Sequence, residues 1–293
     1  MIRQNRVPAR RAGMAIAATV AATLALTGCA PEASSTVSID GSEIAIPAAI
    51  AEAGVLKIGT SPIIGLPWTA LEDGTNKNIG IDADLGRAIG KVLGLKVEFV
   101  DLGFDSLIPS LEAERIDLIM SDMLDTTARQ EVVDFVDYIN GGDGMLVTAK
   151  GGLNPQTLDE LCGLSVGALR GAAAHLSLQE VTCPADNPID IQLFPDTNAE
   201  LIALTSDRLD VAMGDPSTWG YLAAQQPEDY RSVGEIFNSG PLGIGIAKGS
   251  SLVEAVRAAL DVLIASGEYG AVLQKFGMPD PAYLDKATVN GKG

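Results

Sequence analysis

The side chains that most often carry out catalysis or bind metals are scarce in this 293-residue chain. One histidine, His175, and three cysteines leave little material for a zinc site or a Ser-His-Asp triad. Carboxylates are abundant, and a pair such as Asp122 and Asp125 could act as general acid and general base. No nucleophile with a neighbouring base is visible, so we expect no enzyme, no cofactor and no metal site.

The first 28 residues have the composition of an export signal. Residues 1–11 carry four arginines and no acid, and residues 12–27 form an uncharged apolar run that is short for a membrane span. The run ends in Leu26-Thr27-Gly28-Cys29, which resembles the lipobox of bacterial lipoproteins, where the signal is cut before a cysteine that carries a diacylglycerol. This resemblance implies a mature protein that begins at lipidated Cys29 on the outer face of the cytoplasmic membrane. The alternative is an ordinary secreted protein with an incidental cysteine.

The chain after the signal is strongly acidic. Residues 29–293 contain 16 basic and 38 acidic residues, a formal charge of −22. This charge disfavours binding to nucleic acids and to anionic lipid surfaces. Residues 29–41 are rich in Ala, Ser, Thr and Pro and are expected to form a flexible tether. The 47% apolar content and the remaining length predict a folded body of about two domains.

Strands and helices are predicted to alternate along this body. Apolar residues at helical spacing predict a helix over Asp82 to Leu93, between strands Val55 to Thr60 and Val97 to Val100. A helix from Ser106 to Ala113 and a strand from Ile116 to Met120 complete a βαβαβ unit, hence a largely parallel sheet. A second α/β unit of about a hundred residues begins near Met145.

Further elements are expected in and after this second unit. Four strands are predicted over Met145 to Thr148, Leu164 to Ala168, Ile189 to Phe194 and Val211 to Met213. The helices between them cover roughly Ala172 to Val181 and a segment from Asn198. A strand over Ile244 to Ala247 and helices over Leu252 to Ala265 and Glu268 to Phe276 come last.

The two remaining cysteines flank one strand-helix unit. Cys162 precedes the strand from Leu164, and Cys183 follows the helix that ends near Val181. A strand and the helix that returns from it bring these two positions to the same edge of the sheet. In an oxidising exported location a disulfide would contribute about 3 kcal/mol in the chain-entropy model. The alternative is two free buried cysteines.

A series of short motifs resembles one bacterial family, the polar-amino-acid binding proteins of ABC importers. The order and spacing of these motifs carry the resemblance, which covers about Val55 to Phe276. They are Gly80 to Ile89, Leu107 to Leu111, Arg115 to Asp117, Thr126 to Arg129, Val133 to Phe135, Val166-Gly167, Arg170-Gly171, Asp210 to Asp215 and Ile246 to Gly249.

The resemblance implies an α/β fold of the type II periplasmic-binding-protein class, with two lobes joined by two hinge segments. Lobe I would comprise residues 42–141 and 243–293, and lobe II residues 142–242. The family's activity implies a small-molecule ligand, an amino acid or a related amine, that is held in the cleft and delivered to an ABC permease. We expect a monomer.

Two residues are assigned to the ligand's charges by this resemblance. The family's matching arginine holds the ligand carboxylate, a role that falls to Arg129, and the matching aspartate holds the α-ammonium, a role that falls to Asp215. The chemistry fits, because a guanidinium offers a fork of donors and a buried ammonium needs an acid. Without the resemblance, Arg129 would be a solvated surface residue and Asp215 a helix cap before Pro216.

Aromatic side chains make up 4% of the chain, so those near the motifs carry weight. The resemblance suggests Trp68 and Phe104 as walls of the cleft, where each could stack on a ligand or cation. The alternative for both is core packing. For Asp105, the alternative to a place in the cleft is a role as the N-cap of the following helix alone.

Several positions depart from the family pattern. Asp122 and Leu124 stand where a small residue and a small hydroxyl residue are common, and Ala172 and Ala173 replace hydroxyls after Gly171 in the lobe II loop. Hydroxyl bonds to a ligand carboxylate are therefore missing, while a carboxylate is gained at Asp122, with Asp105 and Asp143 as further candidates. This exchange favours a ligand with an extra positive charge or donor group, such as a basic amino acid or a related amine. The alternative for Asp122 is a turn residue bonded to the backbone.

Two other classes of protein resemble the same fold. Periplasmic dehydratases are one, and ligand-sensing receptor domains are the other. The sequence does not separate an importer component from a sensor, because the docking surface has no readable motif.

Overall fold

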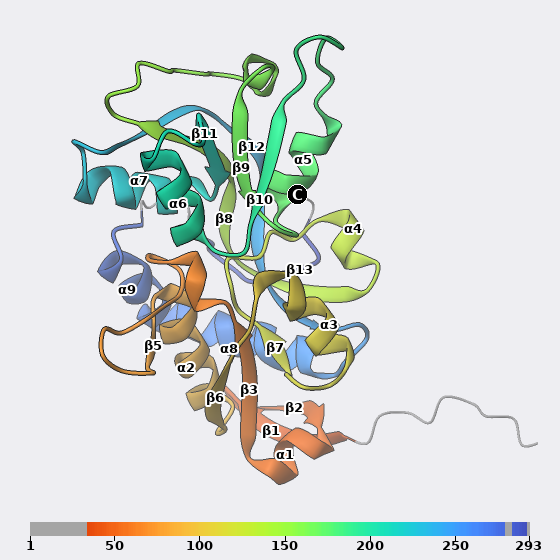
Figure 1. Cartoon of the computed structure of the whole chain (residues 1–293). Helices are drawn as coiled ribbons and strands as arrows, with labels where there is room; N and C mark the ends of the chain where they lie inside the picture. The colour runs from red at the N-terminus through yellow and green to blue at the C-terminus, as the bar shows by residue number, and fades with distance from the viewer. Residues whose placement is uncertain (1–33, 279–282, 292–293) are drawn as a thin grey trace, which may run out of the picture. The chain divides into compact units, whose positions relative to one another are not determined.

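The computed structural model describes residues 34–278 and 283–291, which alternate strands with helices (Figure 1). These residues form a mixed nine-stranded sheet in the order β10-β9-β11-β8-β12-β7-β3-β6, with β13 beside β8. The strands of this sheet are β3 (Val55–Thr60), β6 (Lys96–Asp101), β7 (Leu118–Ile119), β8 (Val133–Thr148), β9 (Ser165–Leu169), β10 (Asp190–Phe194), β11 (Val211–Gly214), β12 (Tyr230–Ala247) and β13 (Thr288–Val289).

Helices flank the sheet. Those that matter for the site are α2 (Ile81–Val92), η2 (Phe104–Ser106), α3 (Leu107–Glu112), α4 (Thr127–Gln130), α5 (Ala173–Glu180), α6 (Thr197–Thr205), α7 (Pro216–Gln225), α8 (Leu252–Ser266) and α9 (Glu268–Lys275). β3 has the predicted bounds, and α2 begins one residue before the predicted helix and ends one residue before its predicted end. The predicted strand over 116–120 is shorter in the structure, where only Leu118 and Ile119 pair with neighbours.

Buried apolar side chains divide the described residues into two regions. The terminal half, residues 34–141, 242–278 and 283–291, packs α2, α8 and α9 against β3 around Leu56, Leu85 and Leu260. The central half, residues 142–241, has its own cores around Val166 and Leu204. The half that contains both ends of the described chain is thus assembled from two separate stretches of sequence.

The two long strands β8 and β12 pass from one half to the other. They pair antiparallel over 16 and 18 residues, and the predicted strands 145–148 and 244–247 are only their ends. The register shifts on either side of Phe237 and again after Leu242. A Cβ atom on Gly142 would lie 2.9 Å from the carbonyl oxygen of Phe237, so this close approach of the strands requires glycine. The two halves are therefore continuous through paired but irregular strands.

The predicted flexible tether is wrong for residues 34–41. Ser34–Ile39 forms β1, which pairs antiparallel with β2 (Ser42–Pro47) in a hairpin that packs Ile39 and Ile46 into the core of the terminal half. Asp40 and Gly41 both have positive φ, 47° and 77°, as a two-residue hairpin turn requires. The Asp-Gly pair between alternating apolar residues was the sequence signal for this hairpin. Cys29 and the signal segment lie outside the described residues.

Cys162 and Cys183 are joined in a disulfide bond, as their positions in the sequence predict. The sulfur atoms are 1.97 Å apart and the Cα atoms 5.6 Å apart. Cys162 precedes β9, and Cys183 follows α5. The bridge therefore ties the end of α5 to the start of β9 within the central half.

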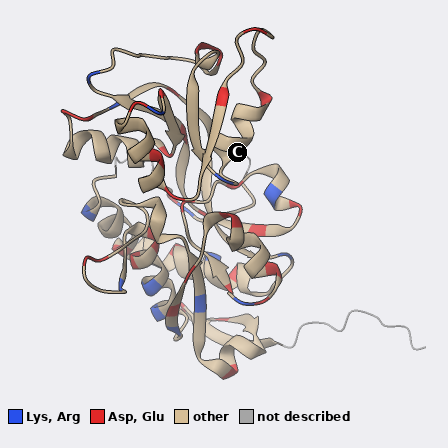
Figure 2. Ribbon diagram, in the orientation of Figure 1, with Lys and Arg blue, Asp and Glu red and all other residues tan. Residues whose placement is uncertain are grey.

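Charge is unevenly distributed over the two halves. In Figure 2, Asp and Glu positions are marked on both halves, whereas most Lys and Arg positions are in the terminal half, several of them on helices. Among the described residues, we find no helix with the length and apolar character needed to span a bilayer.

Candidate functional site

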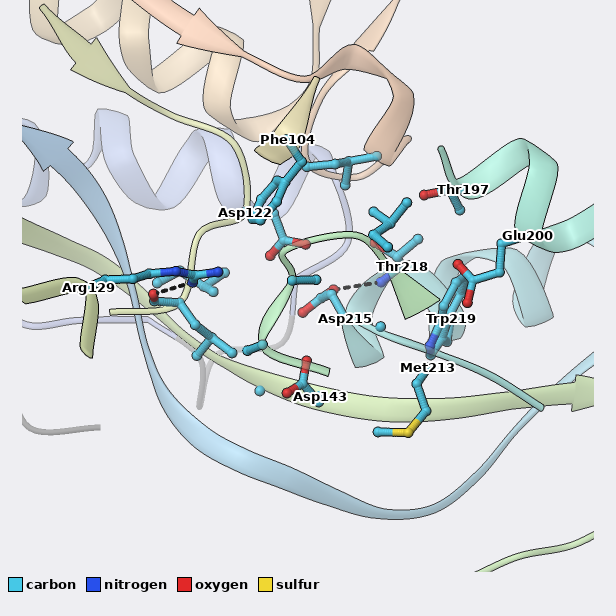
Figure 3. Close-up of a pocket in the computed structure, with 18 residues that line it drawn as sticks. Phe104, Asp122, Arg129, Asp143, Thr197, Glu200, Met213, Asp215, Thr218 and Trp219 are labelled. Atoms are coloured by element: carbon cyan, nitrogen blue, oxygen red, sulfur yellow. Dashed lines mark hydrogen bonds between the residues drawn. The ribbon is translucent and has the colours of Figure 1, made fainter. Parts of the chain in front are cut away.

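A pocket lies between the terminal and central halves and is lined by residues from both (Figure 3). A water-sized group can enter about 50 Å³ of this pocket, within about 550 Å³ of empty space that includes open solvent. The ionisable residues in its described lining are Asp122, Arg129, Asp143, Glu200 and Asp215. Four carboxyl groups therefore accompany a single guanidinium among the described lining residues.

Arg129 lies on the short helix α4, where the Thr126 hydroxyl accepts the backbone N–H of Arg129 at 3.3 Å. Its guanidinium donates to the carbonyl oxygens of Leu124, at 2.7 Å, and Gly171, at 3.1 Å. The guanidinium carbon also lies 5.7 Å from the centre of the Phe104 ring. Burial lowers the pKa of Arg129, and nearby acids, Asp143 foremost, oppose that shift. The side chain remains a fixed cation with further N–H donors.

Asp215 follows β11 and is also the N-cap of α7, so the capping alternative describes its local role. Its Oδ1 accepts the backbone N–H of Thr218 at 2.8 Å and the indole N–H of Trp68 at 2.7 Å. Its Oδ2 is buried and has no hydrogen-bond partner among the described residues. Burial raises the pKa of Asp215 to about 6 despite these bonds. One oxygen thus caps the helix while the other is unsatisfied.

Asp122 combines an unusual backbone with an unsatisfied carboxylate. Its φ is 50°, and its backbone N–H donates to Oδ2 of Asp82 at 3.0 Å. Its own Oδ1 is buried without a partner among the described residues. Burial, followed by the negative charges of Asp215, Asp82 and Asp143, raises the pKa of Asp122 well above its ordinary value. Asp122 is therefore a turn residue in its backbone, as the alternative in the sequence analysis held, and its side chain lines the pocket.

Asp82 is a supporting residue that sequence reasoning missed. It is fully buried in the first turn of α2, where Tyr138 donates to its Oδ1 at 2.6 Å. Burial raises the pKa of Asp82 to about 7. An acid among the apolar residues of α2 was the available signal, because carboxylates are rarely fully buried without a specific role.

Asp143 and Glu200 contribute the other two carboxyl groups. Asp143, on β8, accepts the amide N–H of Asn238 at 2.7 Å, and burial raises its pKa to about 6. Glu200, on α6, was not identified from the sequence. It is 1% exposed and shares a helix face with the buried residues Ala203 and Leu204. That spacing was a signal for an inward-facing acid.

Some of the other predicted residues line the pocket, and the rest hold a lining residue in place. Phe104, Leu124 and Ala172 line the pocket. Trp68 does not; it is fully buried, with its ring edge-on to Tyr138 at 6.4 Å, and it acts through its bond to Asp215. Gly171 likewise lies outside the lining and contributes the carbonyl that accepts Arg129. The expected aromatic wall at Trp68 is therefore a support behind the acid.

The acid-base pair suggested by the sequence is not assembled. Asp122 lines the pocket between the halves, but Asp125 lines a separate cavity and hydrogen-bonds Gln130 and Asp137. Asp105 is absent from the described lining, and it does not cap α3. In the described ranges, no group of three or more His, Cys, Asp and Glu side chains is arranged to hold a metal ion.

Comparisons with known proteins agree with this architecture. The family model described as bacterial extracellular solute-binding proteins, family 3, matches residues 56–279. The arginine-binding protein ArgT of Corynebacterium glutamicum is 28% identical over 84% of this chain and 81% of its own length. The lysine/arginine/ornithine-binding periplasmic protein of Escherichia coli is 30% identical over 75% of this chain and 86% of its own.

A solved structure extends the likeness to the fold. The crystal structure of the ancestral amino acid-binding protein AncCDT-1, a precursor of cyclohexadienyl dehydratase, superposes with a TM-score of 0.71 at 27% identity. The alignment covers 78% of this chain and 98% of that one. The predicted α/β fold class of the type II periplasmic binding proteins is confirmed.

Proposed function

Because the chain belongs to the bacterial extracellular solute-binding proteins of family 3, we propose that it captures a cationic amino acid for an ABC importer. The observation that carries this proposal is the charge of the pocket. Asp122, Asp143, Glu200 and Asp215 share its lining with Arg129. A buried carboxylate without a partner is costly, and a ligand cation is the group that offsets this cost.

The proposed pose follows from the unsatisfied atoms. The α-ammonium lies between Oδ1 of Asp122 and Oδ2 of Asp215, both of which are buried oxygens without a partner among the described residues. The ligand carboxylate takes N–H donors of Arg129 that are not bonded to Leu124 or Gly171. Phe104 and Leu124 contact the apolar part of the ligand, and Gly171 and Trp68 hold Arg129 and Asp215 in place. The names of the two relatives support the same ligand class. One is an arginine-binding protein, and the other is a lysine/arginine/ornithine-binding protein.

We further propose that binding closes the two lobes expected from the sequence, residues 42–141 with 243–293 and residues 142–242. Two hydrogen bonds between the halves support closure, Trp68 to Asp215 and Arg129 to Gly171. Both involve residues of the proposed pose. The irregular crossing of β8 and β12 near Gly142 is the natural place for a hinge.

The cellular setting is proposed from the leader and the family. The protein is exported, anchored through lipid on Cys29, and delivers its ligand as a monomer to an ABC permease. The export-type leader and the Leu26-to-Cys29 motif support this setting.

A dehydratase-like activity is less well supported. One structural neighbour is described as a precursor of a dehydratase, but the pairing of Asp122 with Asp125 as acid and base lacks a shared cavity. A sensor that reports the same ligand to a membrane partner would use the same pocket. The two roles differ in the partner, and a permease and ATPase encoded beside the gene would favour import.

A thermal-shift screen of the mature protein tests the proposal. L-arginine, L-lysine and L-ornithine at about 100 times their dissociation constants should each add about 2.7 kcal/mol to the free energy of unfolding. L-glutamate, which places a negative charge among the acids, should leave the melting temperature unchanged. A protein stabilised by L-glutamate but by none of the cationic amino acids would contradict the proposal.

A further inference from the structure

The carboxylate of Glu200 lies at a place where the fold itself has no use for a charge. Glu200 is 1% exposed on the inward face of α6, beside a core that contains Leu204, Leu209 and Trp219. An apolar side chain at this position would extend that core, and a carboxylate adds a desolvation cost. The acid is therefore explained by the pocket that it lines.

Glu200 is only partly satisfied within the described residues. The backbone N–H of Met213 bonds the carboxyl group, but Oε1 is buried without a partner, and no described ion pair includes this residue. Burial raises the pKa of Glu200 to about 8. The unpartnered oxygen of Glu200 is therefore available to accept a hydrogen bond from a ligand.

The surroundings of Glu200 differ from those of the other acids. In Figure 3, Asp122, Asp143 and Asp215 lie on the side of the pocket toward Arg129, whereas Glu200 lies on the far side next to the Trp219 ring. The indole N–H of Trp219 is bonded to the carbonyl oxygen of Gly144 at 3.2 Å, which fixes the ring beside the acid. A carboxylate next to an indole ring suits an ammonium or guanidinium group.

We propose that Glu200 forms a second cation subsite, which holds the terminal ammonium or guanidinium group of an elongated ligand. The other cationic group of this ligand lies at Asp122 and Asp215. This inference rests on the proposed function and deepens it, because it requires two positive charges at opposite ends of one ligand. Trp219 would contact the terminal group through its ring.

Calorimetry with L-arginine and L-citrulline tests this subsite. The two amino acids have nearly the same shape, but the urea group of citrulline is uncharged. The parent protein should bind L-arginine at least about tenfold more tightly, since a desolvated charge pair exceeds a neutral hydrogen bond. Glu200→Gln should weaken L-arginine binding by at least about 30-fold and change L-citrulline binding by less than about threefold. Glu228→Gln, which removes an exposed acid outside the pocket, is the control with the same change of charge.

The outcomes separate the two claims. A parent protein that binds none of L-arginine, L-lysine and L-ornithine overturns the proposed function. A parent that binds L-arginine, together with a Glu200→Gln variant that keeps the parent preference for L-arginine over L-citrulline, overturns only the subsite.

A measurement on the unmodified protein serves even if the variant does not fold. Near pH 7, L-arginine binding should release up to about one proton more than L-citrulline binding, because the bound cation ionises Glu200. Titrations in buffers with different ionisation enthalpies measure this difference. Equal proton release for both amino acids would count against the subsite.

Discussion

Asp125 and Asp137 are as deeply buried as the acids of the pocket, yet they are bonded within the fold. Asp137 Oδ2 accepts the Thr288 hydroxyl at 2.7 Å and the backbone N–H of Gly291 at 3.0 Å. Asp125 accepts the amide N–H of Gln130 at 2.8 Å, and its carboxyl group interacts with that of Asp137. This cluster fixes the C-terminal segment 288–291 against β8.

The pocket acids differ in where they lie. All five acids have one buried oxygen with no hydrogen-bond partner among the described residues. The carboxyl groups of Asp125 and Asp137 interact with each other, whereas Asp122, Asp215 and Glu200 line the pocket. The comparison separates two uses of a buried acid. Asp125 and Asp137 should contribute to the stability of the free protein, whereas the pocket acids should lower that stability until a cation binds.

The largest effect is expected for Asp215→Asn. The amide oxygen can still accept the N–H groups of Thr218 and Trp68, so the free protein should be as stable as the parent or slightly more stable. Loss of the charge opposite a desolvated ammonium should cost roughly 3–5 kcal/mol, a hundredfold to several thousandfold in L-arginine affinity. Calorimetry measures the affinity, and a loss of only a few-fold would refute the ammonium role.

The converse behaviour is expected for Asp137→Ala. This change leaves the Thr288 hydroxyl, the Gly291 N–H and Asp125 without their partner, so the free energy of unfolding should fall by about 2–3 kcal/mol. L-arginine affinity should stay within about threefold of the parent. Urea unfolding followed by tryptophan fluorescence gives the stability. An Asp137→Ala variant that stays stable but binds L-arginine poorly would contradict the assignment of Asp137 to stability and of the pocket acids to binding.

A change of pH should act in opposite directions on stability and on binding. Burial raises the folded pKa of Asp143 and Asp215 to about 6 and that of Asp82 to about 7, above the ordinary 3.8. Their stabilising contribution is present in full below the unfolded pKa and is lost as pH rises through the folded pKa. The ligand-free protein should therefore lose roughly 3–4 kcal/mol of stability between pH 5.5 and 7.5.

L-arginine affinity should instead increase by about tenfold over the same interval, because the ligand's cations favour ionised acids near Arg129. Urea unfolding and calorimetry at several pH values measure the two trends. If stability and affinity both rose with pH, the pocket acids would not be the groups that titrate.

The smallest effect is expected for Lys248→Met, at the edge of the bonded cluster. Lys248 Nζ lies 2.7 Å from Asp134 Oδ1, and its side chain is 49% exposed. Burial raises the pKa of Asp134, but hydrogen bonds from the Gly249 N–H and Lys248 outweigh that effect and hold it below the usual value. The exposed pair should contribute at most about 1 kcal/mol, lost in the variant with no change in affinity. Urea unfolding near pH 7 in low salt measures this loss of unfolding free energy. A larger loss would contradict the view that the pair is a weak surface ion pair.

Local patterns predicted most of the elements that form the halves. The apolar run from Val55 to Thr60 and the helical spacing around Leu85 and Leu260 were sufficient, because each element buries one clear face. The long strands β8 and β12 were not predicted over their full length. Glycine and polar residues interrupt the apolar pattern where these strands cross between the halves and line the pocket.

The site was predictable only where residues lie in motifs. Arg129, Asp215 and Asp122 could be named from the sequence, and all three line one pocket. Glu200 and the orientation of Trp68 could not, because a local pattern does not say which side chains from the other half approach a buried group. Asp82 lies 40 residues before Asp122 in the chain, and its carboxylate accepts the backbone N–H of Asp122.

The hairpin β1–β2 would limit how far the proposed lipid anchor lets the protein reach from a membrane. Strand β1 begins at Ser34, and its last residue, Ile39, is buried in the core of the terminal half. With lipid on Cys29, as proposed, the chain between the anchor and the hairpin spans at most about 18 Å even when fully extended. A link of this length would keep the body close to the lipid headgroups. The anchored protein would then search the membrane surface for a permease by lateral diffusion, in two dimensions rather than three.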